Sequence, residues 1–270
     1  MPATIKLTLQ LESNSTQGIH LGASAGAAIL TMIAAQNPNF AQELHDANPK
    51  PYSLGLEPDS GFGGVHGRYL ELRLQVLHDA LTPILQAALE PGAFFGTQAD
   101  PLRGRLLNVE VETESYTEFV ARVAALPVQR LIRLEFLSAT AVSGGGNTWA
   151  LPLPNYMFNG LRLRFEKFSN LRLQGSFSSY TNQQLECQHY RVYQKLERLS
   201  AKEQFDGFKG TATLVCQGQP ESVRVMVLLA RFAEWSGIGV NTAFGCGQVR
   251  VALETARVRD EAGEELRFTN

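Results

Sequence analysis

The sequence predicts an α+β protein in which two β-α-β-β-α-β units follow one another. In residues 1–128, stretches of alternating apolar and polar residues, typical of half-buried strands, occur in that order with longer stretches of helical composition. Residues 129–270 repeat this order of elements without visible sequence identity to the first half. Because the order is that of the ferredoxin-like fold, each half is predicted to form one ferredoxin-like domain.

The elements of the first half follow from local patterns. "ATIKLTLQLE" alternates and predicts the first strand, and the Ala- and Leu-rich stretch after it predicts a helix that Asn37-Pro38 can interrupt. A Pro-Gly pair predicts the end of the second helix, and "GFGG" (61–64) predicts a turn. Strands are predicted at 3–12, 50–56, 68–77 and 105–114, and helices at 22–47 and 78–92.

Similar patterns define the second half. Periodicity is lost in "AALPVQ", which places the domain boundary near Leu126-Pro127, and "SGGGN" (143–147) predicts a turn after the next strand. Strands are predicted at 130–140, 171–179, 209–218 and 247–255, and helices at 154–169 and 221–236. The basic and aromatic stretch "ECQHYRVYQKLER" is open between a solvated hairpin and a helix face.

Composition is that of a soluble globular protein, with 270 residues of which 44% are hydrophobic and 19% charged. Three widely spaced cysteines, Cys187, Cys216 and Cys246, suit a reducing compartment and lack the spacing of a metal site. The N-terminal residues show no signal-peptide core, and no apolar run approaches the roughly 18 residues of a membrane span. We expect a cytoplasmic protein with no membrane contact, metal or cofactor.

Charge is distributed unevenly along the chain. The net charge is -2, but residues 1–128 hold seven Lys/Arg against 13 Asp/Glu, and residues 129–270 hold 17 against 13. A polyanionic partner would therefore be attracted to the second half. Random variation of surface charge is the alternative explanation.

Residues 237–247 read "GIGVNTAFGCG", with a G-x-G at each end of the stretch. A dinucleotide-binding fingerprint needs G-x-G-x-x-G between a strand and a helix, whereas here the third glycine position is Thr242 and a helix is predicted to precede the loop. A P-loop needs Gly-Lys-Ser/Thr, which is absent. The context excludes both kinds of nucleotide site.

"SGIGVNTAFGCGQV" resembles the C-terminal glycine-rich loop of the repeat-associated mysterious protein superfamily of CRISPR systems. Three further stretches resemble that superfamily's sixth Cas family, the endoribonucleases that cut CRISPR precursor RNA within its repeats. They are "FAQELHDANPKPYSLGLE", "LEFLSATAVSGGGNTWALPLPNYMFNGLRLRF" and "FDGFKGTATL". The resemblance spans most of the chain in the same order, and it implies two tandem ferredoxin-like domains.

The resemblance also implies a metal-independent reaction. The 2′-hydroxyl beside the scissile phosphate attacks it and leaves a 2′,3′-cyclic phosphate and a 5′-hydroxyl. Such a reaction needs a base for the 2′-hydroxyl, an acid for the 5′-oxygen and a donor for the charge on the phosphorane. Histidine suits either proton transfer because its usual pKa lies near neutrality.

His45 occupies the family's catalytic histidine position, and Lys50 matches a lysine that could stabilise the phosphorane. The alternatives are a histidine that complements a helix dipole and a solvated loop lysine. The family often has a tyrosine in the middle of the first helix, but "AAILTMIAAQ" has none. Thr31 is the nearest hydroxyl there, Tyr52 offers one from the next strand, and His189 is the second candidate histidine.

Basic and glycine-loop residues are the predicted RNA contacts. They are Arg162, Arg164, Lys167, Lys195, Arg198, Gly237, Gly239, Asn241, Thr242, Gly245 and Gly247. Lys195, Arg198 and Lys202 would share one face if their stretch is helical. A solvated surface charge is the alternative for each basic residue. Trp235 and Phe244 could stack on bases, although core packing is favoured, and Trp149 is predicted to pack under the loop.

Together these features predict an endoribonuclease that cuts CRISPR repeat RNA, its main partner, into guide units. One alternative is an RNA-binding subunit of a CRISPR effector complex that does not cleave. Another is a ferredoxin-like protein-interaction module without an RNA role. A homodimer is left open.

Overall fold

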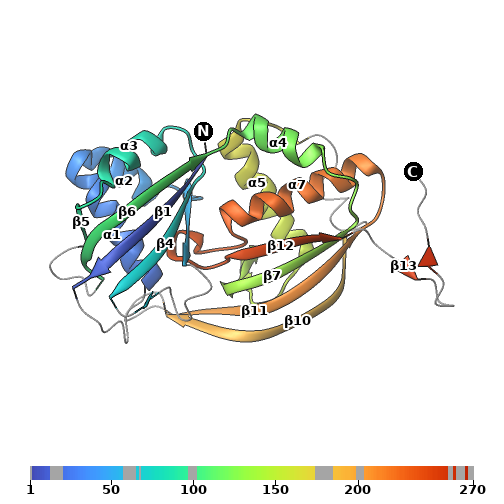
Figure 1. Cartoon of the computed structure of the whole chain (residues 1–270). Coiled ribbons are helices and arrows are strands. Elements are labelled where there is room, and N and C mark those ends of the chain that lie inside the picture. The colour runs from blue at the N-terminus through green and yellow to red at the C-terminus, as the bar shows by residue number, and fades with distance from the viewer. Residues whose placement is uncertain are drawn as a thin grey trace.

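The chain forms two large antiparallel sheets, and helices cover one face of each sheet (Figure 1). The computed structural model describes residues 2–12, 21–56, 65–66, 68–96, 102–173, 185–198, 204–254, 258–259 and 265–266. Within this part of the chain, none of the helices has the length and apolar character needed to cross a membrane.

The first sheet has the strand order β2-β4-β1-β6-β5. Its strands are β1 (Ala3–Leu11), β2 (Tyr52–Leu56), β4 (Tyr69–Val76), β5 (Phe94–Phe95) and β6 (Gly104–Thr113), and the short β3 (Val65–His66) pairs with β4. Alternate residues of β1, among them Ile5, Leu7 and Leu9, are buried in a core shared with α1 (Leu21–Gln36) and α3 (Leu81–Ala88). The alternation seen in the sequence is therefore the burial pattern of this central strand.

The predicted break in the first helical stretch is confirmed. α1 ends at Gln36, and α2 (Pro38–Asp46) begins immediately after Asn37. The side chain of Asn37 caps α2 by accepting a hydrogen bond from the Phe40 N–H at 3.1 Å, and Pro38 occupies the first helical position, where no N–H is needed. The break turns the chain so that His45 lies at the far end of a separate short helix.

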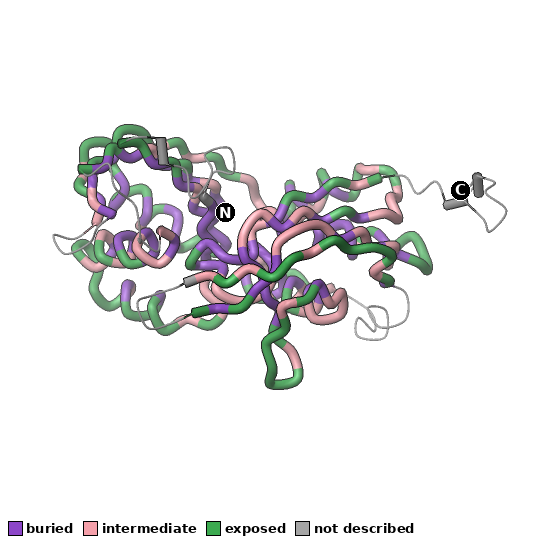
Figure 2. Tube along the Cα trace, turned by 90° about the horizontal axis from the view of Figure 1, so that it is seen from below, coloured by how far each residue is buried: buried purple, intermediate pink, exposed green. Residues whose placement is uncertain are grey.

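The second sheet has the order β10-β11-β7-β12. Its strands are β7 (Leu131–Thr140), β10 (Leu185–Arg198), β11 (Gln204–Cys216) and β12 (Val249–Glu254), and its covering helices are α5 (Pro154–Ser169) and α7 (Pro220–Ser236). In both large sheets the first strand of the unit lies between the third and fourth, as in a ferredoxin-like domain. The predicted tandem ferredoxin-like fold is confirmed, and Figure 2 shows the buried residues running along the inside of both units.

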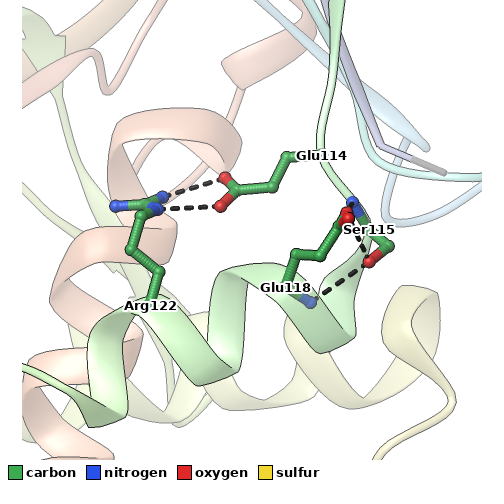
Figure 3. Close-up of polar contacts among 4 residues, drawn as sticks. All are labelled: Glu114, Ser115, Glu118 and Arg122. Carbon is green, nitrogen blue, oxygen red and sulfur yellow. Dashed lines mark hydrogen bonds and ion pairs between the residues drawn. The ribbon is translucent and has the colours of Figure 1, made fainter.

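A helix that the sequence patterns did not predict, α4 (Tyr116–Ala124), follows the last strand of the first sheet. A capping box starts it, because the Ser115 hydroxyl accepts from the Glu118 N–H at 3.1 Å and the Glu118 carboxylate accepts from the Ser115 N–H at 2.8 Å (Figure 3). Arg122 donates two hydrogen bonds to the carboxylate of Glu114, at 2.8 and 2.9 Å. The capping box fixes the start of α4, and the Arg122–Glu114 pair ties its last turn to the residue that follows β6.

α4 packs on the second core, although it precedes the proposed domain boundary at residues 128 and 129. Tyr116, Phe119 and Val123 are buried in the cluster that includes α5 and α7. The rings of Phe119 and Trp235 have centroids 4.6 Å apart. The division into residues 1–128 and 129–270 stays a proposal, and α4 is the segment that links its two parts.

The remaining differences concern hairpins and short strands. β8 (Val142–Gly144) and β9 (Asn147–Trp149) form a hairpin around the predicted turn, and β13 (Val258–Arg259) pairs with β14 (Glu265–Leu266). Residues 171–173 have no regular structure, so no strand begins there as predicted, and 174–179 lie outside the described residues. The turn predicted at 61–64 also lies outside them.

Candidate functional site

The glycine loop (residues 237–247) connects α7 to β12 and folds back onto the protein. Gly239 and Gly247 have φ angles of +84° and +71°, a region that residues with a side chain rarely adopt. A Cβ at Gly239 would lie 1.9 Å from the carbonyl oxygen of Ala141, and one at Gly247 would lie 2.0 Å from that of Ile238. Protein backbone therefore occupies the space that these two glycines leave, which corrects the expectation that they admit RNA.

Main-chain hydrogen bonds fix the conformation of the glycine loop. This conformation determines which polar groups of the loop are accessible to a ligand. The Ile238 N–H donates to the Gly247 carbonyl at 2.8 Å, and the Gly247 N–H donates to the Ala139 carbonyl at 3.0 Å. Thr242 is only 5% exposed, so little of it is accessible to a ligand, and its contact with RNA stays a prediction. Asn241 stays partly exposed, in a left-handed conformation with φ +58°. It is the polar loop side chain best placed to reach a ligand.

The glycine loop also joins the two domains. A Cβ at Gly22, on α1, would lie 1.8 Å from the carbonyl oxygen of Phe244, so α1 and the loop meet backbone to backbone. Ala243 belongs to the core of the first sheet, and the Ser53 hydroxyl of β2 donates to the Trp235 carbonyl at 2.5 Å. The glycine loop therefore packs between the two domains and contacts both. Two further predicted RNA contacts within it, Gly237 and Gly245, are buried.

Arg164, predicted to contact RNA, instead holds the glycine loop from α5. Its guanidinium donates to the carbonyl oxygens of Ser236 and Gly239, both at 2.8 Å, and to that of Gly237 at 3.3 Å. Burial lowers the pKa of Arg164 to about 10, so the side chain stays charged at neutral pH. The role expected from the sequence is corrected because these carbonyls already engage the guanidinium.

His45 lies in the last turn of α2 and is exposed. The ammonium group of Lys50 donates to the carbonyl of His45, and to that of Leu44 at 3.1 Å. Lys50 therefore caps the C-terminal end of α2, where free carbonyls favour a cation. Partial burial lowers the pKa of Lys50. The arrangement places a positive charge next to the main chain of the candidate catalytic histidine.

A second lysine reaches the same segment from the other domain. Lys167, near the end of α5, donates to the carbonyl oxygen of Asn48 at 2.9 Å. Asn48 belongs to the connection between α2 and β2, three residues after His45. The connection is thus tied to the end of α2 by its own Lys50 and to the second domain by Lys167.

The other hydroxyl and histidine candidates lie in different surroundings. Tyr52 is 2% exposed, and burial raises its pKa to about 12, so its hydroxyl is withdrawn from solvent. Thr31 is exposed on α1, and its hydroxyl donates to the Ala27 carbonyl at 2.9 Å. His189 is exposed on β10, in the second sheet. Of these three side chains, Thr31 and His189 offer their polar groups at the surface.

The helix-face interpretation of the basic stretch around Lys195 is wrong, because this stretch is the 14-residue strand β10. Successive strand residues alternate faces, so Lys195 and Arg198 belong to opposite faces of the sheet. Lys202 lies outside the described residues. On α5, Arg162 lies 3.5 Å from Glu166, whose carboxylate is 7% exposed, so part of its charge is balanced within the protein.

Exposed aromatic side chains are the features that sequence reasoning missed. Trp149 is 40% exposed on the β8–β9 hairpin, so its predicted packing under the loop is wrong. Tyr190 and Tyr193 are more than half exposed on β10, an edge strand. Phe244 is 37% exposed at the tip of the glycine loop, whereas Trp235 packs in the interior as favoured. The alternation of aromatic and basic residues in "HYRVYQK" was the available signal for an exposed strand.

Comparison with known proteins shows which proteins this chain resembles. Residues 134–249 match the family model of the CRISPR-associated endoribonuclease Cas6. This stretch of the chain is therefore similar to Cas6 endoribonucleases. A Cas6 endoribonuclease of Mycobacterium tuberculosis (strain CDC 1551 / Oshkosh) is 23% identical over 250 residues, which are 91% of this chain and 77% of the relative.

Solved Cas6 structures share the fold along nearly the whole chain. A Cas6 product complex superposes with a TM-score of 0.76 at 22% identity, covering 93% of this chain and 100% of the other. Thermus thermophilus Cas6 superposes with a TM-score of 0.69 at 22% identity, covering 93% and 98%. The Cas6 family model includes the glycine loop and α5, while His45 and Lys50 precede the matched residues.

Proposed function

We propose that this protein cleaves CRISPR repeat RNA within a precursor transcript and releases guide units. The observation that carries the proposal is the exposed His45, held by Lys50 at the end of α2 in a chain with a Cas6 fold. An endoribonuclease needs an accessible group that exchanges protons near neutral pH, and an exposed histidine supplies it.

The proposed reaction needs no metal ion. The 2′-oxygen loses its proton and attacks the adjacent phosphorus, the bond to the 5′-oxygen breaks, and that oxygen takes up a proton. His45 performs one of the two proton transfers. Lys50 has three N–H donors and uses two on main-chain carbonyls, so the third can stabilise charge on the phosphorane. The products are a 2′,3′-cyclic phosphate and a 5′-hydroxyl.

RNA binding is proposed to depend mainly on the second domain. Its excess of basic residues attracts the phosphate backbone, and Arg162, Lys195, Arg198 and Asn241 are the proposed contacts that the geometry leaves in place. Two Cas6 structures similar to this chain are a product complex and a substrate mimic complex, which supports an RNA partner. Binding should weaken steeply with added salt, because cations are released when phosphates are neutralised.

Cleavage of end-labelled repeat RNA in EDTA tests the reaction directly. The wild type should give 2′,3′-cyclic phosphate and 5′-hydroxyl ends, and His45→Ala should lower the rate by about 10²–10⁴-fold, as expected for loss of a general acid or base. His189→Ala is the matched control, since His189 is also exposed. Equal cleavage by His45→Ala and the wild type would refute the assignment of His45.

A second candidate is an RNA-binding subunit of an effector complex that does not cleave. The absence of a tyrosine from α1, together with the burial of Tyr52, favours this alternative. Salt-dependent binding of repeat RNA without product in any buffer would establish it. No binding even at low salt would instead favour a protein-interaction module, and sedimentation would show whether the chain forms a homodimer.

A further inference from the structure

Two basic side chains of α5 contact the two segments of the candidate site, which are the glycine loop and the connection that follows His45. Arg164 donates to the carbonyl oxygens of Ser236 and Gly239 at one end of the glycine loop. Lys167 donates to the carbonyl oxygen of Asn48, just after His45. Residues three apart in a helix lie on the same side, so one side of α5 faces both segments. The helix is therefore a physical link between the glycine loop and the connection that follows His45.

The end of α5 meets the first domain at a second point. The ring of Phe168 contacts that of His78 edge to face, with centroids 6.4 Å apart. The ammonium group of Lys167 lies 5.6 Å from the centroid of the Phe168 ring. Lys167 is therefore held beside the domain junction by its neighbour, with its charge directed to the Asn48 carbonyl. A lysine extended freely into solvent would make neither contact.

We propose that Lys167 is a positioning residue that fixes His45 relative to the RNA-holding second domain. The inference rests on the proposed function, because it assigns His45 a proton transfer. His45 and the residues proposed to hold most of the RNA belong to different domains, so the position of His45 relative to the bound RNA depends on contacts that cross the junction. A displacement of His45 by about 1 Å relative to the scissile phosphate can lower the cleavage rate by up to about 10²-fold. The rival role is the one expected from sequence, a direct phosphate contact.

Lys167→Met separates the two roles because methionine keeps an unbranched apolar chain and loses the donor. At saturating protein, the single-turnover cleavage rate should fall about tenfold, while the Kd for repeat RNA changes less than about twofold. Lys167→Arg should restore most of the rate, since it keeps a donor. Lys6→Met is the charge-matched control, because Lys6 lies on β1 and pairs with Glu112. It should cleave at the wild-type rate.

Two results would overturn the proposal. A raised Kd with a shallower salt dependence and an unchanged saturating rate would make Lys167 a phosphate contact. Unchanged amide hydrogen exchange at Ala47, Asn48 and Lys50 in Lys167→Met would show that the lysine does not hold this connection, and that readout needs no cleavage. Faster exchange there is the expected result. Absence of cleavage by the wild type would refute the proposed function instead, and the exchange experiment would still decide whether the contact with Asn48 holds.

Discussion

Replacing Gly22 by alanine should destabilise the protein, although alanine is the better helix former. Gly22 is the second residue of α1, and an added Cβ would lie 1.8 Å from the carbonyl oxygen of Phe244 and 2.6 Å from its carbonyl carbon. Cβ atoms essentially never come within 3.0 Å of such atoms, so α1 and the glycine loop would have to separate by more than 1 Å. Overpacking of this kind costs about 1–3 kcal/mol, against a gain in helix propensity of at most about 1 kcal/mol.

Gly160 provides the matched control inside α5. It is exposed, and nothing lies within 4 Å of an added Cβ. Gly160→Ala should therefore raise the free energy of unfolding by about 1 kcal/mol, which is the helix propensity difference alone. The same chemical change thus has opposite expected signs at the two positions.

Urea unfolding followed by circular dichroism measures both variants against the wild type. The midpoint should fall for Gly22→Ala and rise for Gly160→Ala, with no change in the slope that reports exposed surface. A Gly22→Ala variant as stable as the wild type would refute the backbone contact between α1 and the glycine loop. A destabilised Gly160→Ala would refute the propensity argument on which the comparison depends.

Two further predictions concern buried groups. Arg164→Met should lower the free energy of unfolding by about 2–3 kcal/mol, because one carbonyl at the end of α7 and two in the glycine loop lose a charged donor. Arg164→Lys should recover only part of that loss in the same urea assay, and full recovery would contradict the forked geometry. Burial raises the pKa of the thiols of Cys216 and Cys246 from 9.0 to about 12. As the pH rises from 9 toward 12, these thiols lose their protons in the unfolded chain before they do so in the folded protein. The free energy of unfolding should therefore fall over this pH range. Alanine at both positions should flatten that fall in urea midpoints measured across the range, and an unchanged pH dependence would exclude the thiols as its cause.

Most of the fold could be predicted because each unit buries one face of its sheet and one side of each helix. The predicted helix at 154–169 coincides with α5, where apolar residues recur at helical spacing. α4 was missed although Ser115 and Glu118 form a capping signal, since the helix is short and directly follows a strand. β10 could not be assigned because an edge strand with Tyr190 and Tyr193 exposed lacks one continuous apolar face.

The site was less predictable because a sequence does not show which main-chain carbonyl oxygens will accept a hydrogen bond from a given side chain. Arg164, Lys50 and Lys167 all donate to carbonyl oxygens of residues distant from or just before them in the chain. From the sequence, a phosphate contact and a solvated surface charge were both open for each of them. His45 was identified by resemblance to a family, and the fold alone explains only why it is exposed at a helix end.

The meeting of Gly22 with Phe244 has a consequence for how such proteins can be recombined. Where two domains touch through side chains, a change on one surface can be compensated by a change on the other. At this point of the junction a glycine meets a main-chain carbonyl oxygen, so no side-chain atom can move to relieve a mismatch. A chimera that joins the first half of this chain to the second half of a relative should fold only if the relative's glycine loop places its main chain in the same position relative to α1.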